Sequence, residues 1–439
     1  MQFSRRSFGK TFALAVGGLP LWYAESQEAA DAKPPGPNDR PGIALVGCGG
    51  RGTGVGKEAT RFGEMRAVCD VDEKHLERAV NTFAKDGKKP DKVTDFRKLM
   101  ERDDIQVIVN GTPDHWHTLV NLAAAKAKKD VYSEKPLTLT IDEGRRLVRA
   151  VRENKVVLQT GTQQRSDAKF RLACELVRNE RIGKLKTITV WLPAGLRGGP
   201  FPSSPVPPGL NWDYWQGQAP QVDYVKERCH VTFRYWLEYS GGTITDWGAH
   251  HNDIAFWATG MKGPAEVEAR ALIEPVPGGY TAFSEYEVLF TYSNGVRHFI
   301  KTTKDDNIFG GVVNKEGQRN GIRFEGENGW IWVRRGAIEA SDEAILTTPL
   351  PAGAERLPVS NDHMGNFFAC VRSRQSPICD VETGHRSASE CHLAQIALRL
   401  GKKLRWDAES EKFVGDHAAE ANRWVAREMR KPYDYSYVG

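Results

Sequence analysis

Three kinds of feature are absent from the 439-residue sequence, and each absence excludes a class of protein. There is no block of like charge: 61 basic and 56 acidic residues are spread along the chain, so the formal charge of +5 does not favour nucleic acid or an anionic membrane surface as a partner. There is no apolar run long enough to remain as a membrane anchor. The seven cysteines are odd in number and form no Cys-x-x-Cys pair, so we expect free thiols in a chain whose large core needs no disulfides.

Residues 1–32 are predicted to be an export signal outside the fold. Residues 4–10 contain two adjacent arginines, a phenylalanine and a lysine in order, and they precede a short apolar run. This order resembles a twin-arginine signal, which implies the twin-arginine translocase as a partner and a periplasmic or otherwise exported location. Cleavage is expected after Ala24 or Ala32, and residues 33–40 are predicted to be an extended linker.

A glycine-rich turn follows the first predicted strand, Gly42 to Val46. It includes the candidate cofactor-binding residues Gly47, Gly49, Gly50, Arg51 and Gly52. The first, second and last of its glycines fit the G-x-G-x-x-G spacing, which gives a tight turn and lets the backbone approach a pyrophosphate. Asp70 ends the next strand, where a carboxylate accepts hydrogen bonds from ribose hydroxyls and repels a 2′-phosphate. The turn and Asp70 therefore predict an NAD site, with NADP less favoured.

Strand-like and helix-like segments alternate through residues 41–162. Strands are expected at 42–46, 65–69, 105–109, 130–133 and 156–158, and helices at 53–62, 118–128 and 141–154. Repeated units of this kind form a doubly wound parallel sheet, in which ligands sit beyond the carboxyl ends of the strands. Thr112, Pro113 and His117 follow one such end, and Glu134 and Lys135 follow another.

The residues from 163 to 405 are predicted to form a second, α+β domain. Period-two alternation between residues 267 and 334, interrupted by Asn-Gly turns, indicates hairpins and a large open, mostly antiparallel sheet. A proline-rich loop at residues 193–209 is predicted either to lie across the cleft or to make oligomer contacts. Residues 406–439 are expected to be a tail that packs along the surface.

Asp246, His250 and Asp253 carry the candidate chemistry of this second domain. Their i, i+4 and i+7 spacing places them on one face of a helix. Oxidation of a carbinol requires removal of the hydroxyl proton, which a neutral His250 can accept while Asp246 orients the ring. Lys135, at a strand end, can stabilise the alkoxide. No spacing demands a metal ion, and we predict none.

Together the motifs resemble the glucose–fructose oxidoreductase / inositol dehydrogenase / rhizopine-catabolism (Gfo/Idh/MocA) family. The resemblance rests on the glycine turn, Thr-Pro-x-x-x-His at residues 112–117, Glu-Lys-Pro at 134–136 and Asp-x-x-x-His at 246–250, and it covers about residues 40 to 400. It implies a Rossmann domain, an open-sheet domain that mediates subunit association, and hydride chemistry on sugars or polyols. It also implies catalytic roles for Lys135, Asp246 and His250, a cis bond after Lys135, and a substrate or supporting role for Asp253.

Polar and aromatic side chains that suit sugar hydroxyls and ring faces are concentrated after residue 163. The candidate substrate-binding residues are Gln164, Arg165, His230, Arg234, Trp236 and Asp253. Because free NAD is not expected outside the cytoplasm, an exported enzyme should keep its cofactor tightly bound and regenerate it in place.

Three functions therefore remain open. The first is an NAD-dependent oxidoreductase that acts on a sugar, polyol or glycoside. The second is an NAD-dependent glycosidase that works by transient oxidation at C3 and elimination, without the paired carboxylates of ordinary glycosidases. The third is a non-catalytic sugar-binding protein of the same fold.

Overall fold

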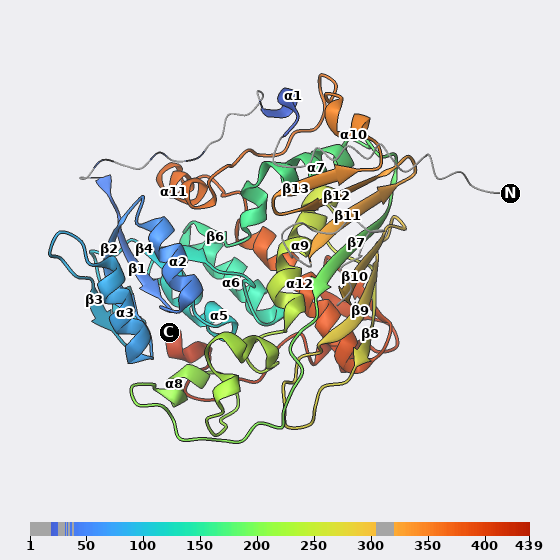
Figure 1. Cartoon of the computed structure of the whole chain (residues 1–439). Helices are drawn as coiled ribbons and strands as arrows, with labels where there is room; N and C mark the ends of the chain where they lie inside the picture. The colour runs from blue at the N-terminus through green and yellow to red at the C-terminus, as the bar shows by residue number, and fades with distance from the viewer. Residues whose placement is uncertain (1–18, 25–30, 32, 34–35, 37–38, 304–319) are drawn as a thin grey trace, which may run out of the picture.

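The computed structural model describes residues 19–24, 31, 33, 36, 39–303 and 320–439. The predicted twin-arginine motif lies outside these residues. Two sheets dominate the molecule, one at each side of Figure 1, and a group of helices lies between them.

The first sheet has six strands, all parallel, in the order β3-β2-β1-β4-β5-β6. The strands are β1 (Gly42–Val46), β2 (Glu64–Cys69), β3 (Asp91–Val93), β4 (Val107–Asn110), β5 (Asp130–Ser133) and β6 (Leu158–Thr160). The helices that accompany them are α2 (Gly50–Ala59), α3 (Glu73–Phe83), α4 (Arg97–Met100), α5 (Asp114–Lys126) and α6 (Ile141–Asn154). This strand order confirms the predicted doubly wound Rossmann sheet.

Each face of the Rossmann sheet has its own apolar core. On one face, residues of α2 and α3 pack with residues of α11 (His363–Ser373), a helix contributed from late in the chain. On the other face, α5 and α6 pack against the sheet. The sequence predicted a start for α5 at Thr118, which is wrong by four residues: Pro113 is the N-cap, and Asp114 begins the helix as a first-turn acid. As a result, His115, Trp116 and His117 belong to a buried helical turn.

The second sheet has nine strands in the order β13-β12-β11-β7-β10-β9-β8-β14-β15. The strands are β7 (Leu185–Pro193), β8 (Glu266–Ile273), β9 (Glu285–Thr291), β10 (Arg297–Thr303), β11 (Gly321–Gly326), β12 (Trp330–Arg334), β13 (Ala337–Ala340), β14 (Leu404–Asp407) and β15 (Lys412–Val414). The pairing of β7 with β10 is parallel and the others are antiparallel, which confirms the predicted mostly antiparallel sheet.

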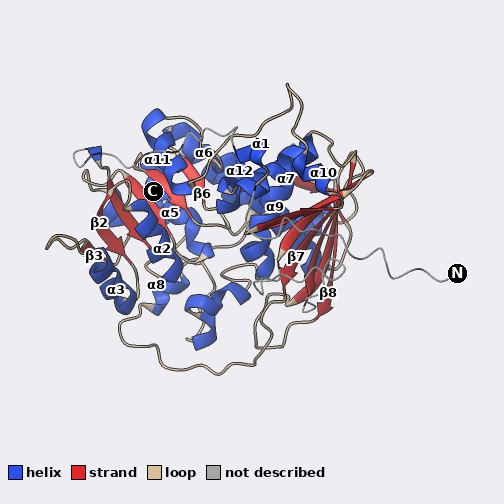
Figure 2. Ribbon diagram, turned by 45° about the horizontal axis from the view of Figure 1, so that its top comes forward, coloured by secondary structure: helices blue, strands red, loops and turns tan. Residues whose placement is uncertain are grey.

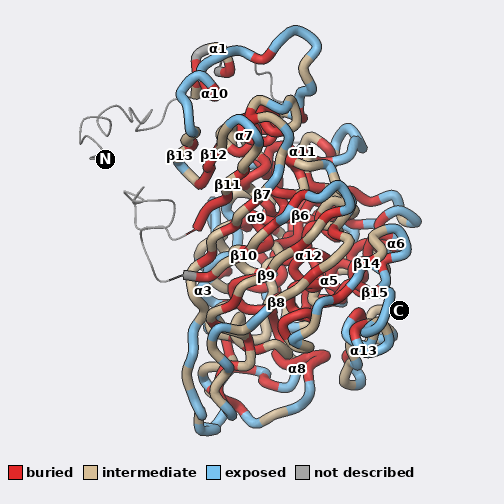
Figure 3. Tube along the Cα trace, turned by 90° about the vertical axis from the view of Figure 1, so that its right-hand side faces the viewer, coloured by how far each residue is buried: buried red, intermediate tan, exposed pale blue. Residues whose placement is uncertain are grey.

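Helices cover only one face of this second sheet. α7 (Ala168–Arg178), α9 (Thr243–Thr259) and α12 (Val381–Leu400) pack on the face toward the Rossmann domain. The opposite face carries no described helix, and Figure 3 looks onto it. Strand β9 alternates buried and half-buried positions, as a sheet with one covered face requires. The shorter helices are α1 (Leu21–Ala24), α8 (Trp212–Gln216), α10 (Glu343–Thr347) and α13 (Ala418–Asn422), with 3₁₀ turns at Gln163–Ser166, Lys226–Arg228, His230–Tyr235 and Tyr435–Val438.

The two domains are joined by close contacts. α6 and α12 approach so tightly that a Cβ atom on Gly144 would lie 2.0 Å from His385 Nδ1. The proline-rich loop reaches back to the Rossmann domain, where the Asn211 amide donates to the Val71 carbonyl at 3.0 Å and the Glu73 amide donates to the Gly209 carbonyl at 2.9 Å. None of the residues 193–209 lines the cavity between the domains, so the structure does not decide between the two predicted places for this loop.

The last residues do more than cover a surface. β14 and β15 extend the edge of the large sheet, and the chain then returns to the Rossmann domain. There the ring of Tyr433 lies 5.7 Å from that of Trp116, and Arg430 forms a 2.7 Å ion pair with Asp213 of α8.

A segment from the predicted leader also packs into the second domain. Tyr23 is 1% exposed in the core, its hydroxyl oxygen accepts a 3.1 Å hydrogen bond from Arg171 Nε, and Trp22 Nε1 donates to the Leu346 carbonyl at 3.2 Å. Asp31 accepts hydrogen bonds from the backbone amides at 361 and 362. Cleavage after Ala24 would remove the contacts of Trp22 and Tyr23, and cleavage after Ala32 would remove those of Asp31 as well.

Two other expectations concern the chain as a whole. All seven cysteines are buried and free, which confirms the predicted thiols. Among the helices that the structure describes, none combines the length and apolar character needed to cross a bilayer.

Candidate active site

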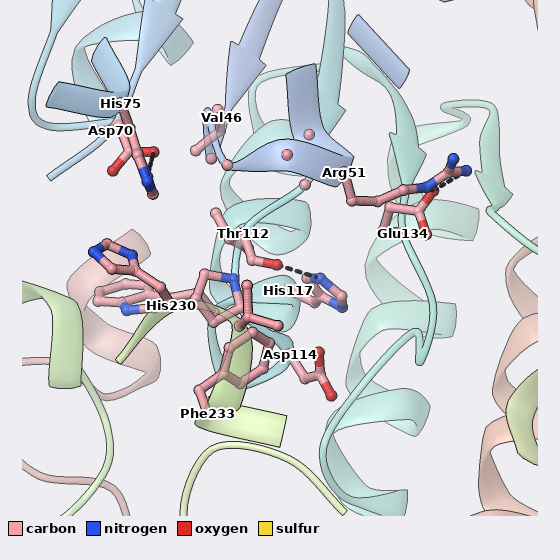
Figure 4. Close-up of a pocket in the computed structure, with 18 of the residues that line it drawn as sticks. Val46, Arg51, Asp70, His75, Thr112, Asp114, His117, Glu134, His230 and Phe233 are labelled. Atoms are coloured by element: carbon pink, nitrogen blue, oxygen red, sulfur yellow. Dashed lines mark hydrogen bonds and ion pairs between the residues drawn. The ribbon is translucent and has the colours of Figure 1, made fainter. Parts of the chain in front are cut away.

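A cavity of about 790 Å³ lies between the two domains, at the carboxyl ends of β1, β4 and β5. Its Rossmann wall includes the glycine turn, Asp70, the Thr112 turn and the Glu134-Lys135 turn. Its other wall consists of residues from the 3₁₀ turn at His230–Tyr235, from α9 and from the turn between β12 and β13. Figure 4 shows His230 and Phe233 of the 3₁₀ turn on the opposite side of the cavity from Asp70 and His75.

The glycines of the turn differ in what they allow. Gly47 has a φ of 86°, and a Cβ atom on Gly52 would lie 1.9 Å from the Gly47 carbonyl oxygen, so both positions are needed for the turn to pack. A Cβ atom on Gly49 or Gly50 would meet nothing within 4 Å. The open backbone at Gly49 and Gly50, at the N-terminus of α2, fits the pyrophosphate of a dinucleotide.

Asp70 is held with its carboxylate at the cavity edge. Oδ2 accepts a hydrogen bond from the Cys48 amide at 2.6 Å, and Oδ1 accepts one from the Asp72 amide at 3.0 Å. His75 Nδ1 lies 3.6 Å from Oδ2 (Figure 4). A carboxylate fixed in this way, just past the end of β2, fits the ribose of the same dinucleotide.

Arg51 and Glu134 form an ion pair across the cavity from Asp70. The Arg51 guanidinium lies 2.8 Å from Glu134 Oε1, and Gln163 Nε2 donates to the same oxygen at 3.2 Å (Figure 4). Both residues line the cavity as cofactor candidates, and the ion pair occupies one edge of the guanidinium.

His117 connects the two turns that form the floor of the cavity. Its Nδ1 lies 2.6 Å from the Pro136 carbonyl oxygen, and its Nε2 lies 3.0 Å from the Thr112 carbonyl oxygen. Pro113 adjoins it on the cavity wall. The Lys135–Pro136 bond is cis, as the family resemblance implied. His117 thus holds the Thr112 turn against the turn that carries Lys135.

The Lys135 ammonium group reaches across the domain boundary to Asp246. It forms an ion pair with Oδ1 and donates to the backbone carbonyl of Asp246 at 3.2 Å. Arg234 Nε lies 3.6 Å from the same Oδ1. Although burial opposes ionisation of Asp246, the charges of Lys135 and Arg234 prevail and lower the pKa of this carboxyl group.

His250 lines the cavity one turn further along α9 and is 5% exposed. The sequence predicted that Asp246 orients this ring, but no hydrogen bond joins the two side chains, because Asp246 is drawn to Lys135 and Arg234 instead. Burial, followed by the charges of Lys135 and Arg335, lowers the pKa of His250 well below its ordinary value, so the ring is neutral at pH 7. Its Nδ1 is buried without a partner, so Nε2 is the nitrogen available to a substrate.

The next histidine points elsewhere. His251 Nε2 lies 2.9 Å from Asn320 Oδ1 in the domain core, and burial lowers the pKa of His251 to about 4. It is not among the residues that line the cavity.

Four predicted substrate contacts lie outside the cavity, and their placement corrects the sequence interpretation. Arg165 and Asp253 form a bidentate ion pair, with distances of 2.7 and 2.9 Å, that is almost fully buried between α9 and the 3₁₀ turn before α7. Ser387 Oγ donates to the same carboxylate at 2.6 Å. Asp253 shares a helix face with Asp246 and His250. It lies two helical turns beyond Asp246, where this face of α9 packs in the protein core and does not line the cavity.

Gln164 and Trp236 are the other two. Gln164 is 2% exposed, and its neighbour Gln163 is the one that lines the cavity. Trp236 is 2% exposed, donates from Nε1 to the Glu227 carbonyl at 2.8 Å, and carries Arg228 over its ring at 3.7 Å. Trp236 therefore packs in a local core.

The remaining two candidates do line the cavity, at different ends. Arg234 lies beside Asp246, near Lys135 and His250. His230 lies near the predicted ribose end, with Nε2 3.1 Å from Asp72 Oδ2 and its ring 4.5 Å from that of His75 (Figure 4).

Several cavity residues were not among the sequence candidates, and His75 and Arg335 are two of them. His75 lies on the first turns of α3, and its position after Asp70 is the only signal that could have indicated it. Arg335 lies in the two-residue turn between β12 and β13. No local pattern marks Arg335, because its place beside α9 depends on the order of the sheet.

Comparison with known proteins agrees with this geometry. Residues 42–162 match the family model of the oxidoreductase family's NAD-binding Rossmann fold, and residues 198–435 match that of its C-terminal alpha/beta domain. A Glycosyl hydrolase family 109 protein of Shewanella pealeana is 32% identical over 165 residues, which cover 33% of this chain and 36% of that protein. Matches to the next two curated relatives cover 52% and 25% of their lengths, so the chain spans only part of each.

Solved structures show the same fold. The WlbA dehydrogenase from Bordetella pertussis, solved with NADH and UDP-GlcNAcA, matches with a TM-score of 0.63 and 19% identity. The match covers 84% of this chain and 99% of the WlbA chain. The aldose-aldose oxidoreductase from Caulobacter crescentus, solved with glycerol, has a TM-score of 0.60 at 18% identity and covers 83% and 99%. The two matched domains together account for most of the sequence, and the chain belongs to the Gfo/Idh/MocA oxidoreductase family.

Proposed function

We propose that this protein oxidises a CH–OH group of a carbohydrate by NAD-dependent hydride transfer. One observation carries the proposal: Lys135 and the neutral His250 line the same cavity as the glycine turn and Asp70. Similar solved structures that hold UDP-GlcNAcA or L-sorbose support a carbohydrate substrate. Asp70 favours NAD over NADP, because a carboxylate repels a 2′-phosphate.

The chain's own residues handle the proton. NAD bound in the cavity supplies the hydride acceptor and, for a net hydrolysis, the hydride donor of the final step. His250 Nε2 accepts the hydroxyl proton of the substrate, because the buried ring is neutral at working pH. Lys135 stabilises the developing alkoxide, and Asp246 fixes the position of that ammonium group. Asp246 is thus a positioning residue for Lys135.

The contacts beside the ribose end support a tightly held cofactor. The loop that contains Gly209 and Asn211 is hydrogen-bonded to the residues that follow Asp70, and His230 approaches Asp72 from the same domain. Further along the chain, the Trp215 carbonyl is in hydrogen-bond contact with His115 Nε2 and Trp116 Nε1, which also attaches this segment to the Rossmann domain. A dinucleotide would leave only after these contacts open.

Export and self-association belong to the same proposal. The twin-arginine pattern of residues 4–10 supports export, in which the folded, cofactor-loaded protein is the cargo. The helix-free face of the large sheet is consistent with a homo-oligomer in which a second copy covers this face.

A second candidate is an NAD-dependent glycosidase, favoured by the family 109 relative and by Asp114. Asp114 lines the cavity, and burial raises the pKa of its carboxyl group despite the nearby charges of His117 and Arg234. A carboxyl group with a raised pKa is better suited to give a proton to a departing aglycone oxygen. In this reaction oxidation at C3 acidifies the C2 hydrogen, the aglycone leaves with a proton, water adds, and the carbonyl at C3 is reduced again.

One experiment separates these functions. One portion of the purified protein is denatured, and the released NAD is assayed in the supernatant. A second, intact portion is incubated with free sugars and with aryl glycosides. Stoichiometric NADH from a sugar identifies an oxidoreductase, whereas many phenol releases per bound NAD identify the glycosidase. His250→Asn should abolish either reaction, while His251→Asn, a control one residue away, should retain it. Full activity in His250→Asn would refute the assignment of the base.

A further inference from the structure

The part of the cavity around α9 holds more positive than negative charge. We call it the substrate end, and it is lined by Lys135, Arg234, Asp246, Trp247, His250 and Arg335. Three of these side chains are cations and Asp246 is the only carboxylate among them; Asp114, whose pKa is raised by burial, lies near Arg234 and Lys135 in the same cavity. Asp246 is already shared, since Lys135 binds its Oδ1 and Arg234 Nε lies 3.6 Å from the same atom. His250 is neutral and does not change this balance of charge.

Among the described residues, no carboxylate forms an ion pair with Arg335, although Asp167, Glu134 and Asp246 act on its charge from further away. In the part of the chain that the structure describes, its guanidinium makes no ion pair or hydrogen bond and lies 5.2 Å above the ring of Trp247. Partial burial, reinforced by the charge of Arg51, lowers the pKa of Arg335 from its ordinary value, which means that its positive charge is held at a cost. The Trp247 ring supports the guanidinium by a cation–π contact, and the N–H groups of Arg335 form no hydrogen bond with another described residue.

The dinucleotide does not account for this charge. Its pyrophosphate fits the open backbone at Gly49 and Gly50 and its ribose fits Asp70, all on the Rossmann side. Arg51, the cation nearest that loop in sequence, is paired with Glu134. Arg234 and Arg335 come from the other domain, beside the proton-accepting histidine. A partly buried, unpaired guanidinium in a binding cavity is matched best by an anionic group on the ligand.

We propose that the substrate is an acidic carbohydrate, and that Arg335, assisted by Arg234, binds its carboxylate or phosphate group while Lys135 and His250 act on a hydroxyl. The inference rests on the proposed oxidoreductase function and narrows its substrate class. Arg335 becomes a residue that determines specificity, because a planar guanidinium holds an anionic oxygen pair in two parallel hydrogen bonds.

Matched sugars test the inference on the full-length, NAD-loaded protein. Glucose, glucuronate and glucose 6-phosphate differ in one substituent, and galactose with galacturonate forms a second series. We expect kcat/KM for an acidic member to exceed that of its neutral counterpart by about 10- to 100-fold, the range of a charged hydrogen-bonded contact. The preferred anion distinguishes a carboxylate site from a phosphate site. The preference should shrink as salt is raised, since screening weakens ionic attraction.

Variants assign the effect to Arg335. Arg335→Gln should raise KM for the acid by about 10-fold or more, and by clearly more than it raises KM for the neutral sugar at the same pH. Arg335→Lys keeps the charge but loses the paired donors and should fall between. Arg372→Gln, at an exposed position on α11, is the control and should leave the ratio as in the native protein.

Equilibrium binding keeps the two proposals separable. Titration of the loaded protein with each sugar, followed by calorimetry, reports recognition without turnover. If neutral and acidic sugars have the same kcat/KM, and Arg335→Gln does not change the ratio of these constants, the acidic-substrate inference is refuted and the proposed oxidoreductase activity stands. If no sugar is oxidised but glucuronate binds in an Arg335-dependent way, the anion site stands and the proposed activity is refuted.

Discussion

The Lys135 ammonium group is hydrogen-bonded both to the side chain and to the main-chain carbonyl of Asp246, which lies on the other domain. Two contacts from one residue fix the ammonium group in position as well as in charge. The acid of the Asp-x-x-x-His pattern therefore acts on the lysine of the opposite wall, and the histidine one turn away stands free to accept a proton.

Replacement of Asp246 tests this relationship. Asp246→Asn keeps an oxygen for Lys135 but removes the charge that Lys135 and Arg234 share. We expect kcat to fall by about 10²- to 10³-fold, as when a transition-state donor is misplaced, with a smaller change in KM. Steady-state kinetics on the loaded protein measures both constants. Asp142→Asn, which removes an exposed ion pair with Arg146, should leave kcat unchanged.

The pH profile of kcat/KM reports the protonation of His250. Because burial and the nearby cations lower the pKa of His250, the base form persists below pH 6.5, and the acid limb of the profile should lie well below that value. Arg335→Gln removes one of the charges that lower this pKa, so the limb should move to higher pH. An acid limb at or above pH 6.5 in the native protein would contradict a buried neutral base.

Two glycines of the same turn should respond differently to alanine. Gly49→Ala adds a Cβ atom to open space in an ordinary backbone conformation, so the melting temperature should hold while the NAD content of the purified protein falls. Gly52→Ala places a Cβ atom 1.9 Å from the Gly47 carbonyl oxygen, so the fold itself should be destabilised. Thermal melts and cofactor assays on both variants make the comparison. Equal NAD content in Gly49→Ala and the native protein would argue against a pyrophosphate at this position.

The buried pair of Arg165 and Asp253 should matter for stability. Asp253→Asn leaves a guanidinium in the core without its carboxylate, and the free energy of unfolding should fall by about 3 kcal/mol or more. Chemical denaturation measures this loss. If the variant keeps its stability and instead shows a raised KM for sugar, Asp253 contacts substrate after all.

Local patterns predicted the Rossmann half closely, because a strand, a glycine turn and a carboxylate at fixed spacing have few structural solutions. β1, β5 and α6 occur at the predicted residues, and β4 within two. The same reasoning identified the helix face that contains Asp246 and His250, since 3.6-residue periodicity fixes which side chains share a side.

Depth along that face could not be predicted in the same way. Asp253 has the right spacing but lies where α9 is enclosed by α7 and α12, and only the tertiary packing determines where a helix leaves the core. Trp236 and Trp247 are equally aromatic in sequence, yet only Trp247 lines the cavity. Arg335 reaches the site because β12 lies two strands from β7 in the sheet, a nonlocal arrangement without a short-range signature.

Tyr23 provides a test of leader processing. If the mature chain keeps residues 19–31, mass spectrometry of the exported protein should show an N-terminus at or before Leu19. Tyr23→Ala should lower the free energy of unfolding by about 3 kcal/mol, the typical cost of deleting a buried aromatic ring. Tyr23→Phe keeps the ring and removes the hydroxyl group that Arg171 contacts, so it should cost about 1 kcal/mol. An exported, fully stable chain that begins at Glu25 or Lys33 would show that these contacts are dispensable.

The packing of Tyr23 also limits how far the export motif can extend from the folded body. Twelve residues lie between Arg6 and Leu19, and 13 residue steps at full extension span at most about 45 Å. If the protein is exported as proposed, a translocase that binds the two arginines while Tyr23 stays buried must therefore accept the folded particle close to its own surface. The burial of Tyr23 would then keep the leader close to the domain. Recognition of the leader would depend on whether the domain in which Tyr23 is buried has folded.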